Sequence, residues 1–218
     1  MSEFLSYELS DFLLFSRQTY FRQFALINEE FPFLPLLLTA VALAVAIFAG
    51  KRGTLLRLAL LWLACAWLFL HRHYADINWA ADWFAAGFGV QAAALIAVMI
   101  RNPLRHPSPA QTAALVVALF YPLQSVIFGR PWQEAEAVGL SPDATAVFTL
   151  FLLATIAPPV RWILLPIPLL WCVIGLLTLW TMDAPEFWTL ATLLAVSLIA
   201  LTRASAGRQR QSGPAPAD

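Results

Sequence analysis

Long uncharged apolar runs alternate with short polar segments from residue 31 to residue 202. A helix needs roughly 20 residues to cross a hydrocarbon core about 30 Å thick, and about 17 is the lower limit. The runs therefore predict an all-α fold, a polytopic transmembrane helix bundle. Seven spans are expected, in this order: Phe31–Gly50, Leu58–His71 with Thr54–Arg57 joined to it, Trp83–Ile100 starting near Asn78, a run within His106–Gly129 that starts after Pro109, Ala144–Val160, Trp162–Met182 and Phe187–Thr202.

The fifth predicted span begins with the strongest helix-start signal, but two prolines interrupt it near its end. Ser141 is a good N-cap, Pro142 suits the first helical position, and the acid at Asp143 is favoured by the helix dipole. Pro158-Pro159 cuts the segment short, because proline cannot continue the helical hydrogen-bond ladder. If this segment did not cross, the two following spans would reverse direction.

Residues 1–30 form a predicted N-terminal extension ahead of the bundle, which covers residues 31–202. Ser16 can cap a helix, and Pro32 marks a kink before the first span. Four apolar residues fall at helical spacing in that helix: Tyr20, Phe21, Phe24 and Ile27. We therefore expect an interfacial amphipathic helix. Residues 203–218, which are rich in Ser, Gly, Pro, Ala and Arg, predict a disordered cytoplasmic tail.

Composition supports the membrane assignment. Of the 218 residues, 61% are hydrophobic and only 12% charged, against roughly 25% charged in soluble domains. The formal net charge of zero argues against nucleic acid as a partner, because no basic face neutralises phosphates. Cys65 and Cys172 lie inside apolar runs and are interpreted as small core residues.

The charges divide between the two sides of the predicted bundle. With seven spans, one side carries nine basic residues: Lys51, Arg52, Arg57, Arg101, Arg105, Arg161, Arg203, Arg208 and Arg210. The other side carries four: Arg17, Arg22, Arg72 and Arg130. The positive-inside rule then places the N-terminus outside and the C-terminus in the cytoplasm.

The densest polar segment is His71–Trp83, which joins the second and third spans. His71 and His73 point about 200° apart on a helix, so they do not share one metal ion there. His73 and Asp76 remain weak candidate metal ligands, and no cofactor is predicted. A structural interpretation pairs Arg72 with Asp76 at the water interface. No zinc or haem spacing, nucleophile motif or nucleotide-binding loop is present, which leaves no catalytic residues to name.

Asp82 is the preferred candidate, with Asn78 on the same helical face. A carboxylate near mid-bilayer costs roughly 2.5–3.5 kcal/mol, so Asp82 is expected to face the bundle and to have a partner. A substrate site open to the outer face is predicted from these residues: Asn78, Asp82, Gln91, Tyr121, Gln124, Arg130, Glu134 and Glu136. The alternative is interhelical hydrogen bonding that only fixes packing. The loop Gly129–Gly139 is predicted to form a short surface helix.

Four segments carry a resemblance to a known family: "DFLLFSRQTYFRQFALIN", "INWAADWFAAGF", "YPLQSVIFGRPWQEAEAVGLSPDATAVFTL" and "LPIPLLWCVIGLLTLWTM". In this order they resemble an uncharacterised bacterial multi-pass membrane family, catalogued as domain of unknown function 6064. The resemblance implies a bacterial integral membrane protein, and it brings no catalytic residues with it.

Three hypotheses about function follow. The first is a small transporter or permease-like protein for an unknown small solute or ion. The second is a non-enzymatic membrane subunit or sensor, acting with a membrane partner or as a homo-oligomer. The third is a membrane-embedded enzyme, which the His and acid cluster of the polar segment suggests. The lipid bilayer is a partner in all three.

Overall fold

The computed structural model describes residues 15–50, 53–100 and 104–211, and from residue 205 onward only the backbone. Residues 1–14 of the predicted extension lie outside that range. The described elements are all helical. They are, in order, α1(Arg17–Glu30), α2(Leu34–Ile47), α3(Thr54–Ala64), η3(Cys65–His71), η4(Tyr74–Asp76), α4(Ala81–Met99), α5(Pro109–Ala118), η5(Tyr121–Leu123), α6(Gln124–Ile127), η6(Trp132–Glu134), α7(Pro142–Leu153), α8(Pro158–Leu164), α9(Pro166–Thr181) and α10(Glu186–Gln211).

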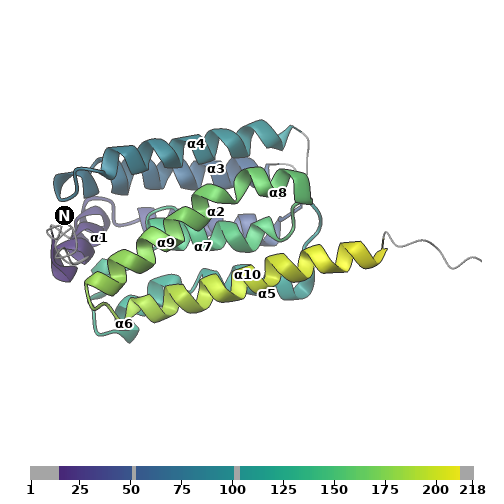
Figure 1. Ribbon diagram of the computed structural model, residues 1–218. Helices are drawn as coiled ribbons and strands as arrows, with labels where there is room; N and C mark the ends of the chain where they lie inside the picture. The colour runs from purple at the N-terminus through teal and green to yellow at the C-terminus, as the bar shows by residue number, and fades with distance from the viewer. Residues whose placement is uncertain (1–14, 51–52, 101–103, 212–218) are drawn as a thin grey trace, which may run out of the picture.

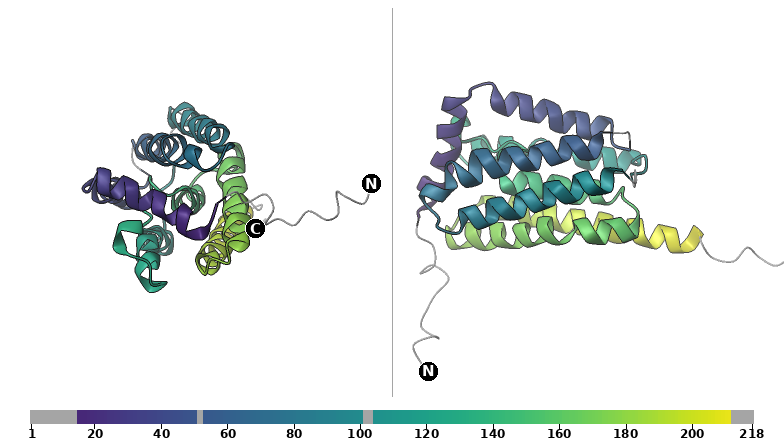
Figure 2. Two further views of the ribbon diagram at one scale, coloured as in Figure 1. Left: turned by 90° about the vertical axis from the view of Figure 1, so that its left-hand side faces the viewer. Right: turned by 90° about the horizontal axis from the view of Figure 1, so that it is seen from above.

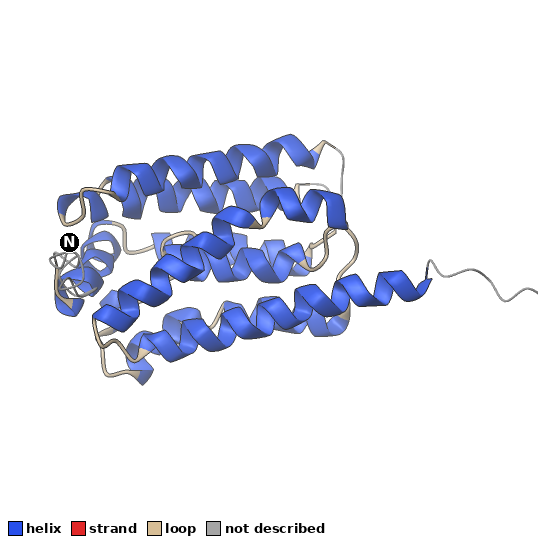
Figure 3. Cartoon of the chain, in the orientation of Figure 1, coloured by secondary structure: helices blue, strands red, loops and turns tan. Residues whose placement is uncertain are grey.

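The long helices run side by side and surround α7, whereas α1 lies across one end of the bundle (Figures 1 and 2). Helices α3, α5, α9 and α10 all pack against α7, and every residue of α7 is buried. Figure 3 shows the short loops that join consecutive helices at the two ends. We call the end covered by α1 the α1 end, and the opposite one the Arg105 end.

Several helices are long and apolar enough to cross a membrane, as a membrane protein requires. Four pass on their own: Thr54–Asp76, Ala81–Met99, Pro109–Ile127 and Glu186–Ala204. The count rises to six if two bent pairs, α1 with α2 (96°) and α8 with α9 (44°), each form one span. The structure thus supports four to six spans, and the seven-span topology stays a prediction.

Helix α7 accounts for the difference between the six spans that the structure supports at most and the seven predicted spans. Its predicted start is confirmed, because the Ser141 hydroxyl accepts a hydrogen bond from the Ala144 N–H and Pro142 opens the helix. Its 12 residues give a helix about 18 Å long, shorter than a hydrocarbon core of about 30 Å. The predicted span continued to Val160, but the helix ends at Leu153, ahead of the two prolines.

Prolines leave buried carbonyl groups without a helical donor, and polar side chains donate hydrogen bonds to these carbonyls instead. Pro168 has no N–H for the carbonyl of Leu164, which instead accepts a bond of 3.1 Å from Gln91 Nε2. The buried Arg161 donates to the carbonyls of Ala154 at 3.2 Å and Ile156 at 2.9 Å, just beyond the end of α7. Arg161 was counted among the nine basic residues of one side of the bundle, yet its side chain is buried.

Helix α1 has the predicted cap and the predicted buried face. The Ser16 hydroxyl accepts a bond from the Thr19 N–H, and Tyr20, Phe21, Phe24 and Ile27 are all buried. They pack on protein: the ring of Phe24 stacks on that of Phe69 with centroids 4.4 Å apart. Helix α1 is therefore a lid on the bundle, whereas its placement at a membrane interface stays a prediction.

The C-terminal tail differs from the prediction over residues 203–211, where α10 continues to Gln211. This segment contains Ala, Arg and Gln, which are good helix formers, and the first proline after it is Pro214. Residues 212–218 lie outside the described range.

Candidate functional site

The loop between α6 and α7 folds into the bundle. Gly129 adopts a φ of +73°, a left-handed conformation that commonly ends a helix, and the Arg130 N–H then donates to the Ser125 carbonyl at 2.7 Å. The predicted surface helix over Gly129–Gly139 is wrong. Only Trp132–Glu134 forms a single 3₁₀ turn, and the chain then turns inward, with the Gly139 N–H donating to Thr145 Oγ1 on α7 at 2.7 Å.

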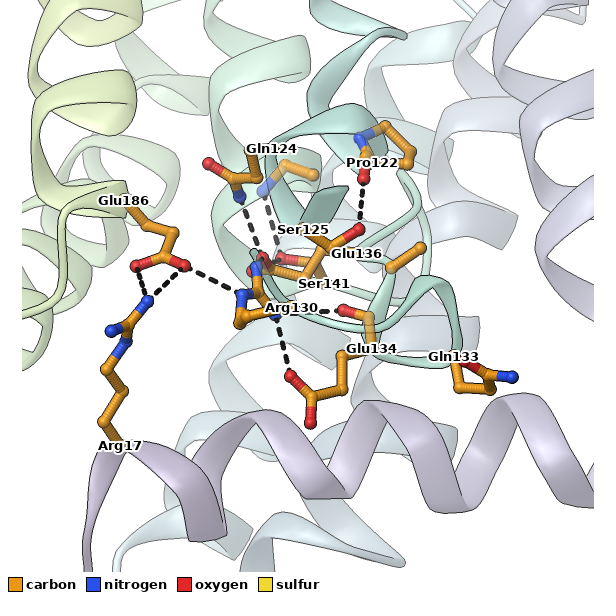
Figure 4. Close-up of polar contacts among 12 residues, drawn as sticks. Arg17, Pro122, Gln124, Ser125, Arg130, Gln133, Glu134, Glu136, Ser141 and Glu186 are labelled. Atoms are coloured by element: carbon orange, nitrogen blue, oxygen red, sulfur yellow. Dashed lines mark hydrogen bonds and ion pairs between the residues drawn. The ribbon is translucent and has the colours of Figure 1, made fainter. Parts of the chain in front are cut away.

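Arg130 is the centre of a buried ionic network that α1 covers (Figure 4). Its Nη2 lies 2.7 Å from Glu136 Oε2, and its Nε donates to Glu186 Oε1 at 2.8 Å. Its Nη1 donates to the Glu134 carbonyl at 3.1 Å and lies 3.6 Å from Glu134 Oε2. The guanidinium carbon also sits 3.6 Å from the ring centroid of Phe21, a cation–π contact with the lid helix.

Glu186 joins the lid to the last helix. It lies in the first turn of α10, where the helix dipole favours a negative charge. Arg17 of α1 donates to both of its carboxylate oxygens, at 3.0 and 3.2 Å. Since Arg130 binds the same carboxylate, α1, the loop and α10 are held together by one acid.

Glu136 is the most enclosed acid of the loop. Gln124 Nε2 donates to its Oε2 at 2.8 Å, and the Ser141 hydroxyl lies 3.5 Å from its Oε1. Burial raises the pKa of Glu136, and the adjacent Arg130 opposes that rise. We call Arg17, Gln124, Arg130, Glu134, Glu136, Ser141 and Glu186 the Arg130 network.

A second polar centre lies next to this network, at the first turn of α7. Asp143 is 1% exposed, and its Oδ1 accepts a bond of 2.8 Å from Trp171 Nε1. The carboxylate lies against Gly175 of α9, where an added Cβ would collide with Oδ1 and come within 3.0 Å of Cγ. Asp143, Trp171 and Gly175 form what we call the Asp143 centre.

The two centres differ in how their charge is compensated. Within the described residues, Asp143 forms no ion pair, whereas Glu136 and Glu186 both bind arginine. The α7 dipole offsets up to about 2 kcal/mol of the cost of a negative charge. Removing an ion from water costs several kcal/mol even after relaxation. The dipole alone is therefore too weak to keep Asp143 ionised at this position.

Among the described residues, the titratable groups that interact electrostatically with Asp143 supply no positive charge. These groups are Tyr20 of α1, Cys65 of η3, Tyr74 of η4, Tyr121 of η5, Glu136 of the loop and Cys172 of α9. The Tyr121 hydroxyl and Gln124 Oε1 are both buried. These two side chains interact with each other, so the surroundings of Asp143 include a second polar pair.

The structure brings together half of the predicted site residues. Gln124, Arg130, Glu134 and Glu136 are all members of the Arg130 network, and Tyr121 is buried close by. Gln91 lies apart, since it binds the Leu164 carbonyl between α4 and α8. Whether any of these residues binds a substrate stays a prediction.

Asp82 lies outside this group, and the expectation that its carboxylate faces the bundle is wrong. Its side chain is 65% exposed and pairs with His71, Oδ1 to Nδ1 at 2.7 Å. Gly89, two turns further along α4, also faces open space, since an added Cβ there would meet no other atom within 4 Å. Asn78 is engaged locally, since its Oδ1 accepts a bond from the Ala80 N–H at 2.9 Å.

The other side chains of the polar segment also find partners different from those expected. Arg72 binds Glu30 at 2.9 Å, not Asp76, and His73 Nε2 lies 3.7 Å from the same glutamate. Among the described residues, no three His, Cys, Asp or Glu side chains gather in a way that could hold a metal ion.

Sequence reasoning missed Arg17, Glu186 and Asp143 as site residues. Arg17 and Glu186 are separated by 169 positions, so no spacing rule connects them. Asp143 was noticed only as an acid that suits a helix start. The signal that could have found it is the predicted membrane span that follows immediately. An acid at such a span is costly, so it is expected to have a partner.

The comparisons with known proteins place the chain in a family without assigning an activity. A model described as a family of unknown function (DUF6064) matches residues 17–210. No curated protein and no solved structure matches the chain. The match covers both polar centres and all the helices except the last residue of α10. The chain therefore belongs to the family of unknown function DUF6064.

Proposed function

We propose that this chain is a multi-pass protein of the bacterial inner membrane that moves protons, alone or with a small solute, through the Asp143 centre. One observation carries the proposal: a fully buried carboxyl group with no cationic partner in the described chain lies inside a bundle of membrane-type helices. Ionisable residues in such positions are costly, and in membrane proteins they commonly form proton relays. Asp143 is the residue that would carry the proton.

The Arg130 network would act as the gate on the α1 side. Arg17 is about one-third exposed, whereas Glu186 is fully enclosed. A movement of α1 away from the bundle would break the Arg17–Glu186 contacts and uncover the face of Phe21 over which Arg130 lies. That movement would open a path from the α1 end to Glu136 and then to Asp143.

The proposed orientation has the α1 end outside the cell. The acids of the Arg130 network gather at this end, and the opposite end carries Arg105 and Arg203. Basic residues favour the cytoplasmic side. The lid would therefore face the periplasm, and the C-terminus the cytoplasm.

A proton-flux assay tests the proposal. The full chain is reconstituted into liposomes of bacterial polar lipids that contain a pH-sensitive dye, and an acid pulse is applied with Na⁺ or K⁺ outside. We expect faster internal acidification than in empty liposomes. Asp143→Asn should return the rate to that of empty liposomes, because Asn keeps the acceptor for Trp171 but cannot release a proton.

Asp183→Asn is the matched control. Asp183 is exposed at the same end of the molecule, and its φ of 49° suits asparagine. This variant should keep the wild-type rate. Flux equal to that of empty liposomes under every condition, or undiminished flux in Asp143→Asn, would overturn the proposal.

The second candidate is a membrane subunit that transports nothing. The extent of pairing in the Arg130 network favours it, because Arg130, Glu136 and Glu186 each bind at least one opposite charge. Such a network can serve only to hold three segments together. A stable protein without proton flux would favour this candidate.

A further inference from the structure

A cleft separates α5 from α10 near the Arg105 end. It has a volume of about 470 Å³ and reaches inward to Phe151 of the central helix α7. Small side chains create it: Ala110 and Ala114 line it from α5, and Ala200 lines it from α10. In the end-on view of Figure 2, α7 is the helix that the others surround, so this cleft is an opening in the surrounding layer.

The lining is apolar except at the end of the cleft. Gln111 is occupied within the protein, since its Oε1 accepts from the Ser108 N–H at 2.9 Å and its Nε2 donates to the Ala154 carbonyl. Arg203 lies at the rim with an exposed side chain, and it forms no ion pair with any described residue. The cleft thus has an apolar body and one positive end.

Both walls belong to helices that can cross a membrane, Pro109–Ile127 and Glu186–Ala204. In a bilayer the apolar body of the cleft would lie at acyl-chain depth. Water would find few hydrogen-bond partners there. Arg203 lies at the end of the apolar part of α10. Its long basic side chain would therefore extend to the level of the lipid headgroups.

We propose that this cleft binds one anionic phospholipid, with an acyl chain over Phe151 and the phosphate on Arg203. Guanidinium groups bind phosphate in a bidentate manner, and basic pockets between membrane helices hold anionic headgroups. A second copy of the chain is the weaker occupant, because a symmetric contact through α10 would place two Arg203 side chains near each other without an acid. The lipid site does not depend on the proton-transport proposal.

Native mass spectrometry of the full chain in mild detergent tests the site. The protein is titrated with phosphatidylglycerol and, separately, with phosphatidylcholine of the same acyl chains. Phosphatidylglycerol should bind about fivefold more tightly, as one basic residue near an anionic headgroup implies. Arg203→Gln should abolish that preference, whereas Arg105→Gln, an exposed arginine at the same end that does not line the cleft, should keep it.

The second part of the experiment fills the cleft with larger side chains. Ala200→Leu and Ala114→Leu place larger side chains in open space and should weaken the binding of both lipids. Equal effects of Arg203→Gln and Arg105→Gln on the preference would overturn the proposal. A lipid-free dimer that Ala200→Leu converts to monomer would also overturn it, in favour of a second copy as the occupant.

Discussion

The polar segment His71–Trp83 and the Asp143 centre lie at the same end of the bundle and differ in how their charges are held. The segment is rich in charge, and its pairs form at the surface: His71 and Asp82 are 47% and 65% exposed. The Asp143 centre has a single carboxyl group, enclosed by α7 and α9. Charge in contact with water costs little, whereas one buried carboxyl constrains the whole packing around it.

The same contrast holds for the arginines. Arg72 and Arg130 each contact a glutamate at less than 3 Å, but Arg72 lies at the surface and Arg130 is almost fully buried. The density of polar residues along the chain is therefore a poor guide to the site. The burial of a charged residue determines how much it contributes to the stability of the protein.

Removing the buried arginine should have the largest effect on stability. Arg130→Gln would leave Glu136 with neutral partners only and Glu186 with Arg17 alone. We expect a loss of about 3–5 kcal/mol in the free energy of unfolding, measured by denaturant titration in mixed micelles. Arg72→Gln, the surface counterpart, should lose less than about 1 kcal/mol. Similar losses in the two variants would contradict the contrast.

Glycine substitutions give the next largest effect, with opposite signs in the Asp143 centre and on α4. A methyl group at Gly175 would collide with the Asp143 carboxylate and lie 3.1 Å from Leu190 Cδ2, so Gly175→Ala should cost about 1–3 kcal/mol. Gly87 of α4 faces open space. Gly87→Ala should therefore stabilise the protein by about 0.5–1 kcal/mol, through helix propensity. Thermal unfolding of both variants in one detergent checks the signs.

The pH dependence of Glu136 should show a smaller effect. Because its pKa is raised by burial in the folded protein, the folded state binds the proton more tightly than the unfolded state does. Its contribution to stability is complete below the ordinary pKa of 4.5 and is lost as the pH rises through the folded value. Glu136→Gln should therefore gain stability relative to wild type as the pH is raised. A difference in melting temperature that is constant with pH would refute this.

The exposed pair of the polar segment should give the smallest effect. Asp82→Asn removes one partner of His71, but both side chains are in contact with solvent, so the loss in stability should stay below about 1 kcal/mol. Denaturant titration at neutral pH and at two salt concentrations measures it. A loss comparable to that of Arg130→Gln would show that burial is not the deciding factor.

Local signals in the sequence predicted individual helices well. Ser16 and Ser141 cap the helices that follow them, and the apolar spacing from Tyr20 to Ile27 matches the buried face of α1. Each of these features depends on residues within one or two turns. The composition likewise predicted a helical bundle with membrane-type helices, of which the structure supports four to six.

Features that depend on the packing of distant segments were not predictable. The contact between Arg17 and Glu186 joins the two ends of the chain, and the inward turn of the 129–141 loop depends on α7 as the central helix. Asp82 was misplaced because the cost of a carboxylate in a membrane was taken to turn its side chain toward the bundle. In the structure, α4 packs through large residues such as Phe88 and Leu95.

Infrared spectroscopy of the reconstituted full chain tests the central claim most directly, namely that Asp143 is a buried carboxyl group that holds a proton. At neutral pH the wild-type protein should show the carbonyl band of a protonated carboxylic acid. That band should disappear in Asp143→Asn and persist in Asp82→Asn. A wild-type spectrum without the band, or a band that Asp143→Asn leaves unchanged, would contradict the account.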